Sequence, residues 1–338
     1  MNLVQKALSK GGQITPLILP AELTGGLGIM NPSIFVDNDG DILCIIRALN
    51  YTLFHAEHEQ RFPSIWGPLS YLHPEDDQRL VTTNYLCRLD EDFNVVDYTK
   101  IDTSLLDIQP IWEFVGEEDA RLVQWDGDYY AIGVRRDTTT NGVGRMELSK
   151  IKLDKKNWTA KEVSRIRIPE PIPSVEETAY CSKNWMPILD NPFHFIKWSC
   201  PTEVVKAFPD LPPRSEQVAL VEGLYPPTDQ RGGSQVIRWK SQYIAITHEV
   251  ILFKNYMGQK NGTYRHRLCV WDDDYKLIGV SKDNFTFLDG QIEFVCGAAV
   301  IEGNLVVSWG FQDNAAFALQ IPESIVDEMV AEALTYGN

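Results

Sequence analysis

Five copies of one strand–turn–strand pattern are spread along this chain of 338 residues. In the clearest copy, Arg121–Trp125 is typical of a strand, Asp126-Gly127 of a tight turn, and Tyr129–Val134 of the returning strand. An Asp-Gly pair between two β-prone segments is a strong hairpin signal, because the favoured two-residue turn needs positive φ at both central residues. The copies cover residues 31–48, 119–136, 183–199, 233–249 and 297–313. This repetition restricts the chain to folds built from repeated antiparallel sheets.

Further strand-like segments between the hairpins bring each repeat to as many as four strands. Radial repetition of four-stranded antiparallel sheets is a β-propeller. We therefore predict an all-β fold, with residues 1–338 forming a single five-bladed β-propeller domain. The blades are expected at about residues 30–100, 115–170, 180–210, 230–285 and 293–322. The tail IPESIVDEMVAEAL has helical spacing, which predicts a short C-terminal helix over 323–335 on the outside. A β-sandwich would explain the strands but not five matching hairpins.

The ends of these hairpins carry the candidate site. In a propeller blade the first strand lines the channel and the second runs back beside it, so residues before the first and after the second meet at one mouth. This rule selects Asn31, Arg47, Asp119, Arg121, Arg135, Lys183, Asn184, Trp185, Arg231, Ser234, His248, Cys296, Gly297 and Asp313. They are either solvated strand termini or the lining of one cavity, and the gathering of Arg, Asp, His and Trp favours the cavity.

The net charge and the hydropathy of the chain restrict the classes of partner that it can bind. The net charge of −16, from 31 basic and 47 acidic residues, would repel phosphate backbones, so nucleic-acid binding is disfavoured. No apolar run approaches membrane-spanning length, and the first residues, MNLVQKALSKGG, lack the apolar centre of a signal peptide. We expect a cytoplasmic protein that contacts neither nucleic acid nor membrane.

The cysteines and histidines give no pattern for a metal or cofactor. The six cysteines lack C-x-x-C spacing, and four of them, Cys44, Cys87, Cys269 and Cys296, lie in apolar strand-like segments. Buried reduced thiols are expected rather than a disulfide framework or a zinc site. The segment His55–His58 has no third metal ligand spaced nearby.

Residues 51–78 form a long, aromatic insertion after the first hairpin. Long loops in compact domains are usually functional or disordered, and aromatic content disfavours disorder. We expect the insertion either to wall an acceptor site above the channel or to contact a second copy of the chain in a homo-oligomer.

Short motifs in four of the hairpins resemble glycoside hydrolase family 130. GEEDARLVQWDGDYY resembles its signature E-D-P-R followed by a strand, D-G and Y-Y, and NPSIF with the later IIRA resembles its N-P…Y-R-A. RGGSQVI with ITHE is similar to its G-G-T-P…Y-H-G, and FVCGAAV with WGFQD to its F-P-C-G…Y-G-x-x-D. The resemblance spans roughly residues 30–320. It implies a five-bladed propeller of a group that contains mostly inverting β-mannoside phosphorylases, with some hydrolases and related mannosyltransferases.

The resemblance also implies roles for individual residues. Asp119 matches the proton donor, expected to have a raised pKa, although Arg121 beside it offers the alternative of a purely structural, ionised carboxylate. Arg47 and Asp313 match residues that grip the donor sugar. The other expected substrate contacts are Asn31, Arg121, Asn184, Trp185 and Ser234, with Trp185 and Trp198 as stacking surfaces, and the expected phosphate contacts are Arg135, Arg136, Lys183 and His248.

The chain departs from the family pattern at three places. Ala120 replaces the signature Pro, and Ser234-Gln235 replaces Thr-Pro. In the third hairpin the phosphorylases carry His-Arg-Pro, with the Arg holding phosphate, where this chain has Lys197-Trp198-Ser199. The loss of that guanidinium weakens the expected phosphate site.

Two classes of function remain open. The first is an enzyme that moves a mannose-type sugar from an oligosaccharide or sugar phosphate, most simply with inorganic phosphate as co-substrate and a sugar 1-phosphate as product. The alternatives to phosphate as the acceptor of the sugar are a glycan and water. The second class is a non-catalytic glycan-binding propeller. An acid at Asp119 together with cations at Lys183 and His248 favours the enzyme, because a lectin has no use for the acid.

Overall fold

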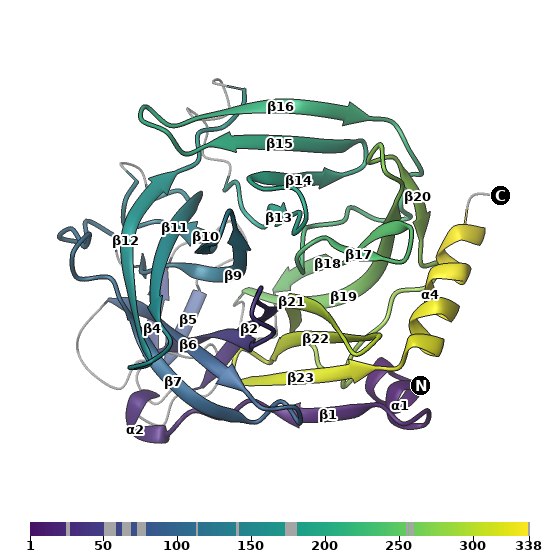
Figure 1. Ribbon diagram of the computed structural model, residues 1–338, viewed down its shortest axis with the longest axis horizontal. Helices are drawn as coiled ribbons and strands as arrows, with labels where there is room; N and C mark the ends of the chain where they lie inside the picture. Colours follow the sequence, from purple (N-terminus) through teal and green to yellow (C-terminus); the bar gives the residue numbers. More distant parts are fainter. Residues whose placement is uncertain are drawn as a thin grey trace.

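The computed structural model places the sheets radially around a central axis, with one strand of each near the axis and the others stacked outward (Figure 1). It describes residues 1–24, 28–50, 59–62, 69–72, 79–112, 114–139, 142–172, 181–254, 256 and 260–336. The prediction of a nearly all-β, propeller-type fold is confirmed.

The largest sheet has nine strands and contains the first two hairpins. Its first strand group is β2 (Ile29–Val36), β3 (Ile42–Leu49), β6 (Leu80–Leu89) and β7 (Val95–Asp102). Its second strand group is β9 (Glu118–Trp125), β10 (Asp128–Arg135), β11 (Arg145–Asp154) and β12 (Thr159–Arg167). The short β8 (Phe114–Val115) pairs with β6. The two groups are joined only where the outer strands β7 and β12 run parallel, at Ile101 with Ala160 and Asp102 with Lys161.

Three four-stranded sheets contain the other hairpins. The third strand group is β13 (Met186–Pro187), β14 (His194–Ser199), β15 (Thr202–Phe208) and β16 (Arg214–Val221). The fourth is β17 (Ile237–Trp239), β18 (Gln242–Lys254), β19 (Lys260–Trp271) and β20 (Leu277–Val280). The fifth is β21 (Glu293–Ile301), β22 (Asn304–Phe311), β23 (Ala315–Ile321) and, from the other end of the chain, β1 (Gln13–Pro16). The sequence did not predict β1 or β16.

Three helices occur among the described residues: α1 (Leu3–Leu8), α2 (Ala21–Thr24) and α4 (Glu323–Thr335). The predicted C-terminal helix is confirmed as α4, which packs its apolar face against β19, β20 and β22. Lys6 of α1 pairs with Glu328 of α4 at 2.9 Å, so both ends of the chain lie on one side of the molecule (Figure 1). None of these helices has the length and hydropathy needed to cross a membrane.

The insertion at 51–78 is described only in the backbone of two paired strands, β4 (Glu59–Phe62) and β5 (Leu69–Leu72). The predictions that it walls an acceptor site or contacts a second copy, and the His55–His58 segment, lie outside the described residues.

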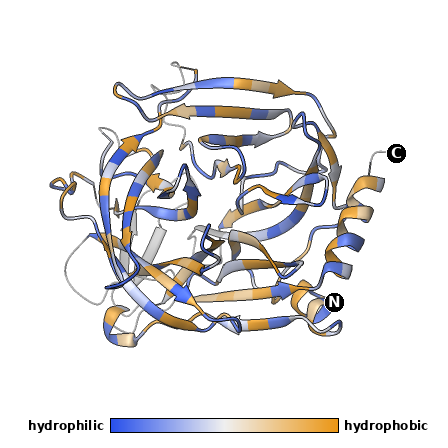
Figure 2. Cartoon of the chain, in the orientation of Figure 1, coloured by the Kyte–Doolittle hydropathy of each residue, from blue (hydrophilic) through white to orange (hydrophobic). Residues whose placement is uncertain are grey.

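The outer strand β7 alternates between more and less exposed residues, because one of its faces is turned to solvent, whereas the inner strands β2 and β9 are buried on both faces. Figure 2 shows both apolar and polar residues along the strands. The four cysteines predicted to be buried, Cys44, Cys87, Cys269 and Cys296, are fully buried and unpaired. This outcome agrees with their place in apolar strands.

The inner strands are tied together across the axis by Gln235, which is fully buried. Its side-chain nitrogen donates to Ser33 Oγ at 3.1 Å and to the carbonyls of Ile34 and Leu122 at 3.2 and 3.0 Å. Its side-chain oxygen accepts from the Ala298 amide at 2.8 Å. A satisfied polar network of this kind holds four strand groups in register. Gln235 stands where the family pattern has Pro, and its side chain makes these hydrogen bonds, which a proline could not make.

Candidate active site at the channel mouth

Two inner strands are bulged at the channel mouth. The pairing of β2 with β3 slips between Met30 and Ser33, and the pairing of β9 with β10 slips opposite Asp119. Asn31 and Asp119 sit in these bulges at φ of 45° and 53°. A bulge redirects a side chain out of the strand's alternation, and Asn and Asp tolerate positive φ better than other side chains. The strain is held in place by the surrounding ladder and aims both side chains at the same point.

The Asp119 carboxylate is anchored by one of its two oxygens. Oδ1 accepts from Asn31 Nδ2 at 2.6 Å and from Arg47 Nη1 at 2.8 Å. Arg47 is itself oriented by a hydrogen bond from Nε to Thr82 Oγ1 at 3.1 Å. No side chain or backbone group of the described residues donates to Oδ2. That second oxygen is therefore the one placed to meet a ligand.

The expected raised pKa of Asp119 is wrong. Burial raises the pKa of this carboxyl, but the charges of Arg47, Lys183 and Arg121 outweigh burial and hold the pKa at about 2. Asp119 is consequently ionised at neutral pH. The same charges make protonation in the free protein unfavourable by several powers of ten at pH 7.

A second carboxyl group at the mouth behaves in the opposite way. Asp313 follows β22 at φ 50°, is partly exposed and makes no hydrogen bond with the described residues. Burial raises the pKa of Asp313 to about 6, with Arg47 opposing the rise and Asp119 adding to it. One channel mouth thus contains a carboxylate that stays ionised and a carboxyl that titrates near neutrality.

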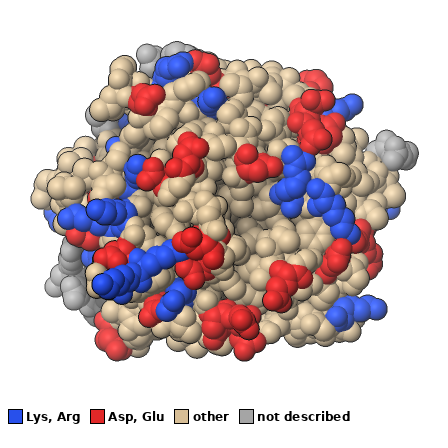
Figure 3. All heavy atoms as spheres, in the orientation of Figure 1, with Lys and Arg blue, Asp and Glu red and all other residues tan. Residues whose placement is uncertain are grey.

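Lys183 is the exposed cation beside this pair. Its charge lowers the pKa of both Asp119 and Asp313, and it forms no ion pair or hydrogen bond with any residue that the structure describes. Figure 3 shows acidic and basic side chains around a hollow near the centre of one face of the molecule. Lys183 therefore remains a candidate to bind an anion.

Arg121 connects three strand groups rather than contacting a substrate, because its side chain is fully buried. Its guanidinium donates to the Asp119 carbonyl at 2.7 Å, to the Gly233 carbonyl at 2.8 and 3.1 Å, and to Asn184 Oδ1 at 3.4 Å. Arg121 is thus engaged by groups of the protein itself, which disfavours the substrate contact expected of it.

Arg121→Ala is expected to lower the free energy of unfolding by at least about 3 kcal/mol, because buried carbonyl oxygens of Asp119 and Gly233 would lose their donors. Guanidinium-induced unfolding followed by tryptophan fluorescence measures this loss. Arg238→Ala, which removes an exposed arginine that bonds Asp273 at 2.5 Å, is the control and should cost about 1 kcal/mol or less. Equal losses in the two variants would contradict the role assigned to Arg121.

His248 is present but is not a cation. Burial lowers the pKa of His248 well below its usual value, and the nearby charges of Lys183 and Arg121 lower it further. The ring stacks on Tyr264 at 5.6 Å and its Nδ1 is buried without a hydrogen-bond partner among the described residues. A neutral His248 can bind phosphate through a hydrogen bond but supplies no charge to it.

Two predicted phosphate contacts are engaged elsewhere. Arg135 is buried, with Nε 3.2 Å from Glu147 and Nη2 3.7 Å from Glu162 inside the second strand group, which makes it a buried structural cation and not the expected phosphate ligand. Arg136 stays at the rim, where its Nε lies 3.4 Å from Glu118. An arginine already neutralised by a carboxylate binds phosphate less strongly.

Two predicted sugar contacts are part of the core. Trp185 is 1% exposed and packs beside Phe195, so its ring cannot stack on a sugar. Ser234 is fully buried, with its Oγ donating to the Gln235 carbonyl and accepting from the Ile246 amide. Asn184 remains near the mouth at φ 63°, but its Oδ1 faces Arg121. All three side chains are buried, and burial keeps them from the expected sugar contacts. The strand pattern of the sequence does not reveal burial at the ends of strands.

The third strand group contains a cation in a different role. Lys197 is buried, and its Nζ lies 2.8 Å from Glu170 and 3.5 Å from Glu203. Two carboxylates more than neutralise this lysine. It therefore does not replace the arginine that the resemblance led us to expect here.

Sequence reasoning missed Tyr264, in β19. Burial raises its pKa, and the negative charges of Asp313 and Asp119 raise it further, which places the phenol near both carboxyl groups. No motif marks this residue, because it reaches the mouth through the long pairing of β18 with β19.

Among the described residues no group of three or more His, Cys, Asp or Glu side chains is arranged to hold a metal ion. The side chains placed at the mouth are carboxyl groups, cations, amides and a phenol.

No family model matches the chain, and no curated protein matches it by sequence. Its fold is similar to that of a beta-1,2-mannobiose phosphorylase from Listeria innocua, with a TM-score of 0.55 at 14% identity over 90% of this chain and 92% of the other. A GDP-Man-dependent mannosyltransferase from Leishmania mexicana gives 0.53 at 13% identity, covering 94% and 93%. A glycosyl hydrolase from Bacteroides ovatus gives 0.55 at 13% identity, covering 88% and 85%. The likeness confirms the expected family 130-like fold.

Proposed function

We propose that this chain, whose fold is glycoside hydrolase family 130-like, is a carbohydrate-active enzyme that catalyses inverting glycosyl transfer on mannose-type β-glycosides, with inorganic phosphate as the acceptor. The observation that carries the proposal is the pair of carboxyl groups at one channel mouth, with the pKa of Asp119 at about 2 and that of Asp313 at about 6. Environments that push two pKa values apart are what an acid and a charge-stabilising carboxylate require.

The two carboxyl groups take different parts in this proposal. Inverting transfer needs a proton for the leaving oxygen and a nucleophile on the opposite face of the sugar. Asp313 is the group able to carry that proton near neutral pH. Asp119, with Oδ2 directed away from its anchors, holds a sugar hydroxyl and stabilises the positive charge that develops on the ring. Asn31 and Arg47 keep the Asp119 carboxylate in position.

Phosphate binding in this proposal depends chiefly on Lys183. Its exposed ammonium group lies close enough to both carboxyl groups to lower their pKa values. His248 adds a hydrogen bond through Nδ1, and Arg136 contributes from the rim. No cofactor takes part.

Transfer to water or to a glycan is the second candidate, and Lys197 favours it. Because Glu170 and Glu203 neutralise this lysine, the third strand group offers the phosphate no charge. An enzyme with fewer free cations at the mouth would bind a neutral acceptor more readily than an anion.

The same proposal includes five blades and a cytoplasmic location. Five blades result if the nine-stranded sheet is counted as two blades that touch along β7 and β12. Clusters of buried apolar side chains between neighbouring strand groups support that count. The unpaired cysteines support a reducing compartment.

Assays with β-mannobiose and phosphate, mannose 1-phosphate with sugar acceptors, and GDP-mannose with the same acceptors test the proposed function. Phosphate-dependent release of a sugar 1-phosphate is the expected result. Release of free mannose without phosphate would mean a hydrolase, and turnover only with GDP-mannose would mean a transferase. Binding of mannosides with no turnover in any assay would favour a lectin and overturn the proposal.

Lys183→Ala is expected to raise the KM for phosphate by about tenfold to a hundredfold, because a charge-assisted hydrogen bond to an anion contributes about 1.5–3 kcal/mol. The KM for the mannoside should change little. Initial rates at varied phosphate measure the effect, and Lys282→Ala, another exposed lysine, is the control. An unchanged phosphate KM would remove Lys183 from the anion site.

A further inference from the structure

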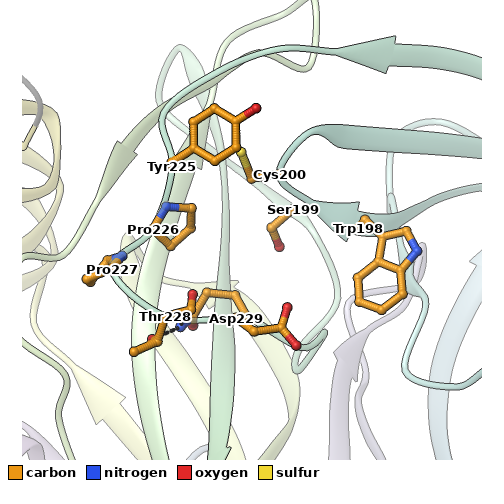
Figure 4. A pocket seen from close by; sticks show the side chains of 9 residues that line it. Trp198, Ser199, Cys200, Tyr225, Pro226, Pro227, Thr228 and Asp229 are labelled. Carbon is orange, nitrogen blue, oxygen red and sulfur yellow. Dashed lines mark hydrogen bonds between the residues drawn. The ribbon is translucent and has the colours of Figure 1, made fainter.

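The cavity drawn in Figure 4, of about 280 Å³, is lined by Trp198, Ser199 and Tyr225. The Arg231 guanidinium lies 5.2 Å from the centre of the Trp198 ring, and the Arg231 backbone pairs with that of His248. This cavity therefore adjoins the channel mouth and belongs to the site already described.

A second cavity, of about 330 Å³, lies where α1 meets the segment 284–289, which precedes β21. The amide of Leu3 donates to the Thr286 carbonyl at 2.9 Å and joins the two segments. Arg265 of β19 also lines this cavity. None of its lining residues was placed at the channel mouth, so it is a separate feature of the molecule.

The Arg265 guanidinium is held in one orientation and keeps one edge open. Its Nη1 donates to the carbonyls of Tyr264 and Gly290 at 2.7 and 3.3 Å, whereas Nε and Nη2 make no hydrogen bond with the described residues. An arginine binds a carboxylate or a phosphate through two parallel hydrogen bonds from such an edge. Because successive side chains of a strand point to opposite faces, Arg265 is turned away from the mouth that Tyr264 reaches.

Arg265 also lacks a carboxylate partner, although the chain has 47 acidic and 31 basic residues. Other arginines of the fourth strand group have one: Arg267 Nε lies 3.7 Å from Glu249, and Arg238 Nη1 lies 2.5 Å from Asp273. No carboxylate in the described part of the chain lies within ion-pair distance of Arg265. In a chain with such an excess of acid, an oriented arginine without a carboxylate is suited to bind an anion from outside.

Asp289 lines the same cavity as Arg265 but is already hydrogen-bonded. Thr286 Oγ1 donates to Asp289 Oδ1 at 2.6 Å, and Asn2 Nδ2 donates to Oδ2 at 2.7 Å. These bonds, with the Arg265 charge as a smaller contribution, hold the pKa of Asp289 below its usual value, so it is ionised at neutral pH. A bare anion is therefore less well matched to the cavity than an anion that also carries hydroxyl donors for Asp289.

The other lining residues add hydrogen-bonding groups and an aromatic side chain. Gln5 Oε1 accepts from the Asn2 amide at 3.2 Å, which leaves Nε2 without a partner among the described residues. Asn284 Nδ2 donates to Glu249 at 2.6 Å, and no described residue donates to its Oδ1. Phe285 supplies the aromatic side chain. These groups suit a hydroxylated ring, and a volume of about 330 Å³ is at the small end of ligand sites.

We propose that this cavity is a second binding site, which takes a small phosphate ester of a sugar. Arg265 binds the phosphate group, and Asp289 accepts hydrogen bonds from the sugar hydroxyls. The choice of a sugar phosphate rests on the proposed function, which makes such an ester a product. A site for a hydroxylated anion rests on the cavity alone.

The test is calorimetric titration of the Lys183→Ala protein, whose mouth has lost its exposed cation, with mannose 1-phosphate and with inorganic phosphate. One mannose 1-phosphate per chain is expected to bind, at least about threefold more tightly than inorganic phosphate, because its hydroxyls add hydrogen bonds. Adding Arg265→Ala should weaken that binding at least about tenfold, because two parallel hydrogen bonds are lost. Arg214→Ala, which removes an exposed arginine of the third strand group, is the control.

Gln5→Glu tests the same cavity without removing a contact within the protein. Glutamate keeps the hydrogen bond that Gln5 accepts from the Asn2 amide at the start of α1, so the melting temperature should not fall. Its negative charge at the cavity should weaken mannose 1-phosphate binding about three- to tenfold. Gln217→Glu, the same change at an exposed position of β16, is the control.

The cavity site and the proposed function fail separately. Mannose 1-phosphate binding that depends on neither Arg265 nor Gln5, or no binding, would overturn the cavity site, whatever the enzyme turns over. Inorganic phosphate bound as tightly as mannose 1-phosphate would overturn the assignment to a sugar ester. Arg265-dependent binding of mannose 1-phosphate by a protein that turns over no mannoside would keep the cavity site and overturn the proposed function.

Discussion

Asp119→Asn is expected to lower turnover by at least about two orders of magnitude, the scale seen when a group acting on the transition state is lost. Its carboxylate is ionised and anchored through Oδ1 by Asn31 and Arg47, while no described residue donates to Oδ2. Asparagine keeps the shape and tolerates the φ of 53° at this bulge. The folded state should therefore survive while the negative charge disappears.

Steady-state rates and thermal unfolding of the same variant measure the two effects separately. Asp126→Asn is a matched control, because Asp126 lies at the other end of the same hairpin at φ 52° and is exposed. Near wild-type rates in Asp119→Asn would show that the chemistry lies elsewhere. Loss of folding would make Asp119 structural.

Asp313→Asn is expected to remove the proton donor and lower kcat by about 10² to 10⁴. In the unaltered protein the protonated fraction of Asp313 falls as pH rises through about 6, the value to which burial raises its pKa. The kcat/KM should therefore decline about tenfold per pH unit above that point. Ionisation of Asp119 cannot cause this decline, because its pKa is about 2.

The pH profiles of the variants test this assignment. Asp313→Asn should abolish the decline above pH 6, and Asp119→Asn should move it to lower pH, because the Asp119 charge raises the pKa of Asp313. Profiles of kcat/KM between pH 4 and 9 measure both effects. A decline that persists in Asp313→Asn would assign the proton to another group.

The stability of the folded protein should change with pH in the opposite direction to kcat/KM: through Asp119 it should rise with pH, whereas kcat/KM falls. Because folding lowers the pKa of this carboxyl to about 2, its stabilising contribution is complete above the ordinary value of 3.8 and is lost as pH falls toward 2. The pH dependence of activity and of stability thus arises from different residues.

Local sequence patterns were sufficient for most of the strands and for the hairpin turns, although not for β1 or β16. The Asp126-Gly127 turn and the alternation on either side predicted the hairpin of β9 and β10, and helical spacing predicted α4. Strand β1 could not be predicted, because its partner β23 lies about three hundred residues away in the chain, as in the pairing of Gln13 with Gln320. Strand pairing over such a distance leaves no local pattern.

The sequence by itself also determined which side chains stand at the strand ends, since a repeated hairpin brings those ends to one mouth. Only the tertiary structure decided their protonation and partners. Arg47 and Asp119, 72 positions apart, form an ion pair that makes the expected acid an ionised carboxylate. Arg121 reaches Gly233, 112 positions away, and is withdrawn from any ligand. The hydrogen-bond partners of a side chain depend on which distant segments fold beside it, and its pKa depends on burial and on every charge nearby, so folding alone decides both.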